Sequence, residues 1–307
     1  MSFAVFTHPD MLGHQPGAGH PERPERLMAV TEALKDGIAG LDLREAPLVD
    51  DADLLRVHPQ DYLDALLEIA PERGLARLDA DTILSPGSLD AARRACGAAV
   101  QAVRAVAAGD MDRAFCAVRP PGHHAEPARP MGFCLFSSVA VAARAAQAAG
   151  LERVAVVDFD VHHGNGTEAV ARQGADHGPG LFFASVHQWP FYPGTGAPGA
   201  RGRIVNAGVP AMAPREAWRA AFEGLMAPLD AFRPDIILIS AGFDAHARDP
   251  LAQQALEAED FAWATRAILE VARSRAGGKV VSSLEGGYDL KALGGSALAH
   301  VRALQED

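Results

Sequence analysis

Asp160, His162 and Asp244 form a pattern that suits a metal ion. Asp160 and His162 stand two residues apart, so both side chains point to the same side if the backbone there is extended. Asp244 follows a different apolar run. Two carboxylates and one imidazole leave a position open for water, which is the arrangement of catalytic zinc sites. We therefore predict that these three residues bind one divalent metal ion.

A pair of histidines, His123 and His124, follows a Pro-Pro-Gly turn. The turn can present both rings to one site. Imidazole titrates near neutrality, so one ring can accept a proton from water and return it to a leaving group. Asp158 is a candidate to hold the tautomer of one ring through a hydrogen bond. Tyr288 follows two glycines, and its hydroxyl could donate to a developing oxyanion.

These residues need elements that bring them together. Short runs rich in Val, Ile, Leu and Phe are typical of strands buried on both faces, and longer Ala/Arg-rich segments follow a helical pattern. We predict strands over 114–119, 153–161, 181–187, 235–243 and 279–284, and helices over 88–109, 137–149, 214–227 and 259–276. This alternation indicates an α/β fold, a single three-layer α/β/α domain over 1–307 with a mainly parallel central sheet. Because the carboxyl ends of parallel strands share one edge, we expect the polar residues after four of these strands to converge there.

The composition excludes several classes of function. The 307 residues are 49% hydrophobic and 22% charged, as in ordinary globular proteins. The formal net charge of −11 argues against direct nucleic-acid binding and would attract a cationic substrate. Three scattered cysteines indicate reduced thiols, and the sequence shows neither a signal peptide nor a membrane span. We therefore expect a cytoplasmic protein with no membrane partner, and the composition leaves its oligomeric state open.

Ordered motifs along almost the whole chain resemble the zinc-dependent histone deacetylase superfamily, which has the arginase/deacetylase fold. The motifs are HPERPER (20–26), RPPGHHA (119–125), GFC (132–134), DFDVHHGNGT (158–167), YPGTG (192–196), SAGFDAH (240–246) and EGGY (285–288). Asn165 and the SAGFD string resemble the class II branch and the bacterial histone deacetylase-like amidohydrolases.

The resemblance implies a role for each central residue. The ligands of one Zn²⁺ per chain would be Asp160, His162 and Asp244. His124 would act as general base and acid, and His123 would stabilise charge beside it while hydrogen-bonded to Asp158. Tyr288 would polarise the acetyl carbonyl.

The resemblance also implies the surroundings of the site. A structural K⁺ would lie at Asp158, Asp160, His162 and Ser185. A narrow acyl-lysine tunnel would be lined by Gly132, Phe133 and Leu251, with Trp189 or Phe191 as its second wall and Asp81 at its rim. Arg26, near the acetate exit, and Asn165 would lie in the layer behind the site.

The implied reaction is hydrolysis of the amide of N-acetyl-lysine in a peptide or protein, or of a related acylated amine, with release of acetate. An acetylpolyamine amidohydrolase is the first alternative, but Leu251 stands where such enzymes carry an acidic gate. An arginase-like dimetal enzyme would need carboxylates at the positions of Gly164 and Gly242. An inactive metal-binding module would be expected to lack one of the catalytic groups, and all of them are present. The ligand set suits Fe²⁺ as well as Zn²⁺.

Overall fold

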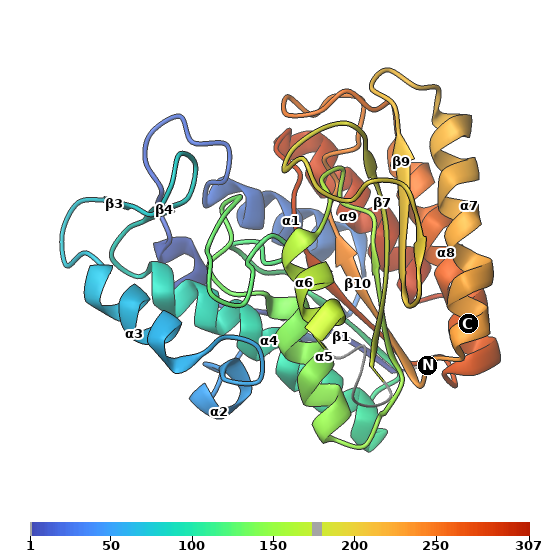
Figure 1. Cartoon of the computed structure of the whole chain (residues 1–307), viewed down its shortest axis with the longest axis horizontal. Coiled ribbons are helices and arrows are strands. Elements are labelled where there is room, and N and C mark those ends of the chain that lie inside the picture. Colours follow the sequence, from blue (N-terminus) through green and yellow to red (C-terminus); the bar gives the residue numbers. More distant parts are fainter. Residues whose placement is uncertain (1, 174–179) are drawn as a thin grey trace.

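The computed structural model describes residues 2–173 and 180–307, and the sheet at its centre is mainly parallel (Figure 1). In the described part of the chain this sheet has nine strands, in the order β2-β1-β5-β11-β10-β6-β7-β9-β8. Every neighbouring pair is parallel except β8 and β9, which are antiparallel. The strands are β1 (Phe3–Thr7), β2 (Leu43–Glu45), β5 (Arg113–Cys116), β6 (Val154–Asp158), β7 (Leu181–Gln188), β8 (Gly199–Arg201), β9 (Ile204–Val209), β10 (Ile236–Ala241) and β11 (Val280–Leu284). A separate antiparallel pair consists of β3 (Ala76–Arg77) and β4 (Ile83–Leu84).

Helices cover both faces of the sheet. The helices are α1 (Glu25–Gly37), α2 (Asp51–Leu54), α3 (Gln60–Ile69), α4 (Ser88–Ala108), α5 (Ser138–Ala148), α6 (Asn165–Gln173), α7 (Arg215–Phe232), α8 (Ala258–Arg275) and α9 (Leu290–Leu304), with a 3₁₀ turn at Pro9–Gly13. One layer contains α4, α5 and α6, which contact one another in sequence order and pack on the sheet. The other contains α1, α9, α8 and α7, again packed neighbour on neighbour. Figure 1 shows α7 and α8 on one side of the sheet and α4 and α5 on the other, so the predicted three-layer α/β fold is confirmed.

The five predicted strands are those of the nine-stranded sheet that are buried at every residue. Every residue of β5, β6, β7, β10 and β11 is buried, which explains their near-continuous apolar composition. A strand buried on both faces is mostly apolar along its length, and the arginine and aspartate residues of these five strands, Arg113 and Asp158, stand at strand ends. The chemistry-bearing residues therefore lie in the loops that leave the carboxyl edge of the sheet.

Helix α7 is longer than the sequence predicts. The prediction ended it at residue 227, and the next residue is Pro228, which cannot donate a helical hydrogen bond. The helix instead continues through Pro228 to Phe232, and Leu225 and Leu229 are both buried beneath it. Burial of this apolar face outweighs the local cost of the proline. Among the described residues, none of the helices is both long enough and apolar enough to cross a bilayer.

Candidate active site

The predicted chemical residues meet at one edge of the sheet. The loop after β5 carries His123 and His124, and the loop after β6 carries Asp160 and His162. Asp244 follows β10. Tyr288 follows β11. Because these strands are parallel neighbours, their carboxyl ends place side chains from four distant segments around one pocket.

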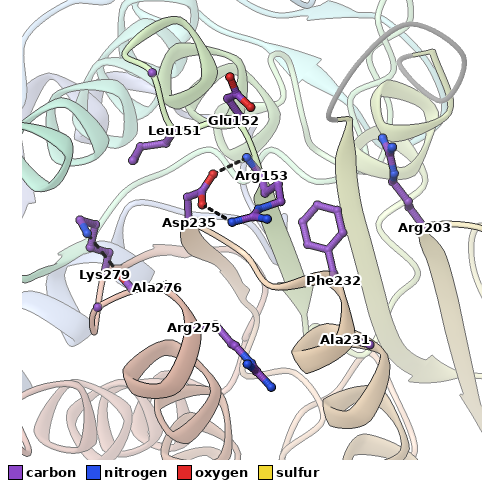
Figure 2. Close-up of a pocket in the computed structure, with 12 residues that line it drawn as sticks. Leu151, Glu152, Arg153, Arg203, Ala231, Phe232, Asp235, Arg275, Ala276 and Lys279 are labelled. Carbon is purple, nitrogen blue, oxygen red and sulfur yellow. Dashed lines mark hydrogen bonds and ion pairs between the residues drawn. The ribbon is translucent and has the colours of Figure 1, made fainter.

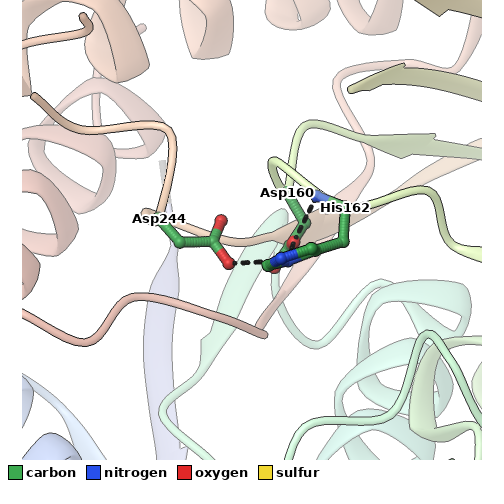
Figure 3. Close-up of side chains that lie close together, drawn as sticks. All are labelled: Asp160, His162 and Asp244. Carbon is green, nitrogen blue, oxygen red and sulfur yellow. Dashed lines mark hydrogen bonds and ion pairs between the residues drawn. The ribbon is translucent and has the colours of Figure 1, made fainter. Parts of the chain in front are cut away.

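The three predicted metal ligands converge on one point (Figure 3). His162 Nδ1 lies 3.1 Å from Asp160 Oδ1 and 3.2 Å from Asp244 Oδ2. One potential ligand atom from each residue lies within 4.8 Å of the other two, and all three residues are buried. A single imidazole N–H cannot serve both carboxylates, and Asp244 Oδ2 lacks a hydrogen-bond partner of good geometry among the described residues.

The electrostatics of this cluster fit a cation. Burial alone would lower the pKa of His162, but the carboxylates of Asp160 and Asp244 close to its Nδ1 raise that pKa to about 10. The cluster therefore favours positive charge between its two carboxylates. Two buried oxygen donors and one nitrogen donor are a ligand set that zinc accepts, so the residues present fit a divalent metal ion.

A loop, and not a strand, brings Asp160 and His162 together. We predicted that an extended strand reaching residue 161 would point both side chains to one side, but β6 ends at Asp158. The backbone N–H of Asp160 donates to Asp158 Oδ1 at 3.1 Å, and the N–H of His162 donates to Asp160 Oδ1 at 2.9 Å. Successive side-chain-to-backbone hydrogen bonds thus fold the segment so that both side chains face Asp244.

Backbone groups from neighbouring segments hold the two carboxylates. The N–H of Gly286 donates to Asp160 Oδ2 at 2.8 Å, and the N–H of Val161 donates to Asp244 Oδ1 at 2.9 Å. A Cβ atom added at Gly242 would overlap Asp160 Oδ2, and one added at Gly286 would overlap Asp244 Oδ2. Glycine at these two positions therefore permits the close approach that the carboxylates require.

The two histidines have different partners. His123 Nδ1 lies 2.9 Å from Asp158 Oδ2, as predicted, and its ring lies 4.0 Å from that of His124. Burial acts to lower the pKa of His123, but Asp160 and Asp158 raise it well above its ordinary value. Burial and the neighbouring His123 and His162 keep the pKa of His124 well below its ordinary value. His124 is therefore a neutral imidazole at neutral pH, as a general base must be.

Tyr288 is held between Arg26 and Phe133. The Arg26 guanidinium lies over its ring at 4.8 Å, and the Phe133 ring is 5.9 Å away edge to face. Arg26 also donates to the carbonyl oxygens of Glu285 and Gly287, on either side of the glycine that contacts Asp160. Burial raises the pKa of the Tyr288 hydroxyl well above its usual range, so the hydroxyl stays protonated and can donate.

A narrow pocket of about 190 Å³ opens onto these groups. Gly132 and Phe133, both in the left-handed region with φ of 56° and 68°, form one wall. Phe191 stacks on His162 with ring centres 5.5 Å apart and forms another. The residues that line the pocket are Asp81, Pro121, His123, His124, Gly132, Phe133, His162, Phe191, Tyr192, Leu251 and Tyr288.

The structure does not bring Trp189 to this pocket. Its backbone N–H donates to the carbonyl of Val209 at 2.8 Å, which continues the β7–β9 pairing by one residue. The side chain then packs against Gly208, at the edge of a separate hollow of about 360 Å³. Of the two alternatives for the second wall, Phe191 is the one that lines the pocket.

A larger hollow lies elsewhere in the described part of the chain, and none of the predicted site residues lines it. It measures about 830 Å³ and is lined by residues at the opposite, amino-terminal edge of β6, β10 and β11 (Figure 2). Arg153 at its wall is paired with Asp235 at 2.9 Å. Helices α5, α7 and α8 end around this hollow. Basic side chains are expected there because they stabilise the partial negative charge of helix C-termini. The larger volume of this hollow therefore does not mark the candidate active site.

The predicted potassium residues lie next to one another. Asp158 and Ser185 are register partners on β6 and β7, and Ser185 Oγ is 2.9 Å from His187 Nδ1. Asp160 and His162 follow directly in the loop after Asp158. Potassium binding at this place stays a prediction.

Sequence reasoning missed three residues of the site. Tyr192 lines the pocket with its ring 5.2 Å from His124, edge to face. Asp249 accepts hydrogen bonds from the N–H groups of Tyr288 and Leu251, at 2.7 and 3.0 Å. Glu285 accepts from the N–H groups of the Pro-Pro-Gly-His turn. Tyr192 and Glu285 belong to the YPGTG and EGGY motifs, and Asp249 follows SAGFDAH by three residues. Their position in or near these motifs is the feature of the sequence that could have indicated them.

The mainly parallel sheet and the polar residues at its carboxyl edge are typical of an α/β enzyme. Comparison with known protein families shows to which family the chain belongs. The chain belongs to the histone deacetylase family, because the family's histone deacetylase domain matches residues 20–304. This membership supports a hydrolase with deacetylase or amidohydrolase activity.

Individual relatives agree with this assignment. The chain is 42% identical to the histone deacetylase-like amidohydrolase of Pseudomonas aeruginosa, over 88% of this chain and 73% of that protein. It is 38% identical to histone deacetylase 10, chloroplastic, of Oryza sativa subsp. japonica, over 95% of this chain and 71% of that protein. The crystal structure of the HDA15 HD domain is similar over 99% of this chain and 91% of that one, with a TM-score of 0.90 at 34% identity.

Proposed function

We propose that this chain is a zinc-dependent deacetylase that hydrolyses the amide of N-acetyl-lysine in a peptide or protein and releases acetate, with residues 1–307 acting as one catalytic domain. The observation that carries the proposal is the shared pocket. His124, His162 and Tyr288 face the same narrow space, whose other walls are largely apolar. A linear aliphatic chain ending in an amide suits such a space, because its methylene groups contact the walls while its carbonyl reaches the polar end.

Asp160, His162 and Asp244 would hold the zinc ion. When bound, zinc would supply Lewis-acid polarisation of the acyl carbonyl and of a water molecule. The chain's own residues then carry out the proton transfers. His124 Nε2 accepts a proton from the attacking water, because its Nδ1 is occupied by Asn165 at 2.8 Å. His124 later returns that proton to the departing amine.

The remaining groups stabilise charge and orient the reacting atoms. The Tyr288 hydroxyl donates to the carbonyl oxygen as negative charge develops there. His123, paired with Asp158, places positive charge beside His124. Phe133 and Phe191 exclude bulk water, which strengthens these interactions. Asp158 and Ser185 would contribute to a structural potassium site one layer further from the pocket.

The structure gives a physical argument against the arginase-like alternative. Two further carboxylates would have to replace Gly164 and Gly242. A Cβ atom at either place would overlap the carboxylate of Asp158 or of Asp160. The acetylpolyamine alternative is disfavoured because Leu251, which lines the pocket, stands where the resemblance places the acidic gate of polyamine-specific enzymes.

The proposal is tested by turnover of matched substrates with the purified protein. We expect hydrolysis of an acetyl-lysine peptide at a higher kcat/KM than that of N-acetylputrescine, inhibition by a hydroxamate, and one zinc per chain by elemental analysis. A higher kcat/KM for N-acetylputrescine would contradict the acetyl-lysine substrate and would support an acetylpolyamine amidohydrolase instead. Two metal ions per chain at the site, or no acyl-amide hydrolysis after zinc loading, would contradict it.

A further inference from the structure

Glu285 connects two parts of the site that are far apart in the sequence. It follows β11 and is completely buried. Its Oε2 accepts hydrogen bonds from the backbone N–H of Gly122 at 2.6 Å and from that of His123 at 3.1 Å. The turn that carries both histidines is therefore fixed to the carboxyl end of β11 by one side chain.

The N–H groups of Gly122 and His123 depend on Glu285 for their hydrogen-bond acceptor. Within residues 2–173 and 180–307, no backbone carbonyl accepts a hydrogen bond from either of them. The other backbone bonds of the turn use its carbonyl groups: the oxygen of His123 accepts from Gly166 and Thr167, and that of Gly122 accepts from Ala125. Buried N–H groups that lose their acceptor are costly, so without Glu285 the turn would be expected to shift.

The same short segment contacts the other functional groups. Immediately after Glu285, the N–H of Gly286 donates to Asp160 Oδ2 at 2.8 Å. Two residues later Tyr288 lines the pocket. Four consecutive residues thus contact the histidine turn, a predicted metal ligand and the substrate pocket. A displacement of Glu285 would change the distance between His124 and Tyr288, which must act on the same amide.

We propose that Glu285 is a positioning residue of the deacylation reaction, which fixes the His123–His124 turn relative to Tyr288 and Asp160. The inference rests on the proposed function. The contribution is a hydrogen bond and does not require negative charge. Glu285 Oε1 has no hydrogen-bond partner among the described residues, so a proton can reside there while Oε2 continues to accept. Burial raises the pKa of Glu285 to about 7, which is consistent with a group that serves in either protonation state.

The test uses two substitutions and a matched control. Glu285→Met keeps the length and apolar volume of the side chain but removes the acceptor, and Glu285→Gln restores an acceptor without charge. Ser283→Ala is the control, because Ser283 is buried two residues earlier on β11 and its hydroxyl has no partner among the described residues. We expect Glu285→Met to lower kcat by ~10²-fold with little change in KM, as misplacement by about 1 Å can do. Glu285→Gln and Ser283→Ala should stay within about fivefold of the parent, since both keep a side-chain oxygen that can accept from the N–H groups of Gly122 and His123.

Hydrogen exchange provides a readout that does not depend on turnover. We expect the peptide covering residues 119–125 to exchange faster in Glu285→Met than in Glu285→Gln, Ser283→Ala or the parent. If Glu285→Met does not fold, Glu285→Asp withdraws the acceptor by one methylene, and the same loss of kcat is expected. Parent-like kcat and exchange in the Met or Asp variant, or a Gln variant as impaired as Met, would overturn the inference. Absence of deacylation in the parent would instead refute the proposed function, and the exchange comparison would still decide the role of Glu285.

Discussion

Asn165 holds His124 in a defined tautomer. The Asn165 side-chain nitrogen donates to Glu126 Oε1 at 2.8 Å, which orients the amide so that its oxygen faces His124 Nδ1, also at 2.8 Å. His124 Nδ1 therefore carries the hydrogen, and Nε2 is left to accept a proton in the pocket. Because the partner is a neutral amide, it orients the ring without adding the negative charge that would favour imidazolium.

This pairing predicts the effect of adding charge. Asn165→Asp should raise the pKa of His124, because a carboxylate stabilises the protonated ring. The base form would then be reached only at higher pH, and the acid limb of the kcat/KM profile should move upward by at least one pH unit. Asn165→Ala, which removes the hydrogen bond without adding charge, should lower kcat without that upward move. Equal profiles for Asn165→Asp and the parent would show that His124 is not the titrating base.

Removal of the Tyr288 hydroxyl separates catalysis from metal binding. Tyr288→Phe should reduce kcat by ~10²–10³-fold, the usual effect of losing one oxyanion donor. Metal content should match the parent, because the predicted ligands are Asp160, His162 and Asp244, none of which is changed. Elemental analysis and steady-state kinetics on the same preparation check both points. Unchanged turnover would exclude the role assigned to Tyr288.

Gly242 should be intolerant of any side chain. In Gly242→Ala the added Cβ would overlap Asp160 Oδ2, which Gly286 also holds from another direction. We expect metal affinity to fall at least tenfold, measured by competition with a chromogenic chelator. Gly224→Ala on α7 is the matched control, because nothing lies within 4 Å of its Cβ position. That variant should bind metal normally and gain up to ~1 kcal/mol of stability.

Two buried histidines predict loss of stability in mild acid. His300 lies between Thr265 and Ser282, and burial lowers its pKa to about 3. Burial also lowers the pKa of His58 to about 4. Each ring takes up a proton in the unfolded chain below about pH 6.5 but stays neutral when folded. Stability is therefore fully present above pH 6.5 and falls as the pH decreases from there toward 3 or 4, by up to ~1.4 kcal/mol per pH unit for each ring.

Denaturant unfolding between pH 7.5 and 4.5 measures this dependence. His300→Gln keeps hydrogen-bonding capacity toward Thr265 and Ser282 but cannot titrate, so its free energy of unfolding should fall less steeply with decreasing pH. The pH dependence of the free energy of unfolding should be less steep in the variant than in the parent by the contribution of one histidine, up to ~1.4 kcal/mol per pH unit. Identical slopes would mean that His300 is not neutral in the folded protein, or that the unfolded chain does not protonate it.

Leu251 should control the choice between acyl-lysine and acetylpolyamine substrates. Leu251→Glu places a carboxylate at the pocket wall, where it would attract the second amine of N-acetylputrescine. We expect the ratio of kcat/KM for N-acetylputrescine to that for an acetyl-lysine peptide to rise at least tenfold. Leu251→Gln, of the same size without charge, should leave the ratio near that of the parent. A similar ratio in all three proteins would place the specificity elsewhere.

The amino-acid sequence is sufficient to predict which edge of the fold carries the chemically active side chains. Apolar runs long enough to be buried on both faces indicated parallel strands, and parallel strands bring their carboxyl ends to one edge. The sequence alone therefore places Asp160, His162, Asp244, the histidine pair and Tyr288 at one edge of the sheet. Elements with weaker patterns were not predicted, such as strand β1, which lies beside the edge strand β2, and helix α9, whose interior holds Gly294 and Gly295.

The tertiary structure alone decided which side chains complete the site. Sequence spacing could not separate Trp189 from Phe191, because one further residue of β7–β9 pairing determines which of them faces the pocket. Nor could it find Glu285 and Gly122, which stand 163 residues apart and meet only because β5 and β11 are neighbours. Local patterns report how a segment is buried, whereas contacts between segments depend on strand order and loop geometry, which arise only when the whole chain packs.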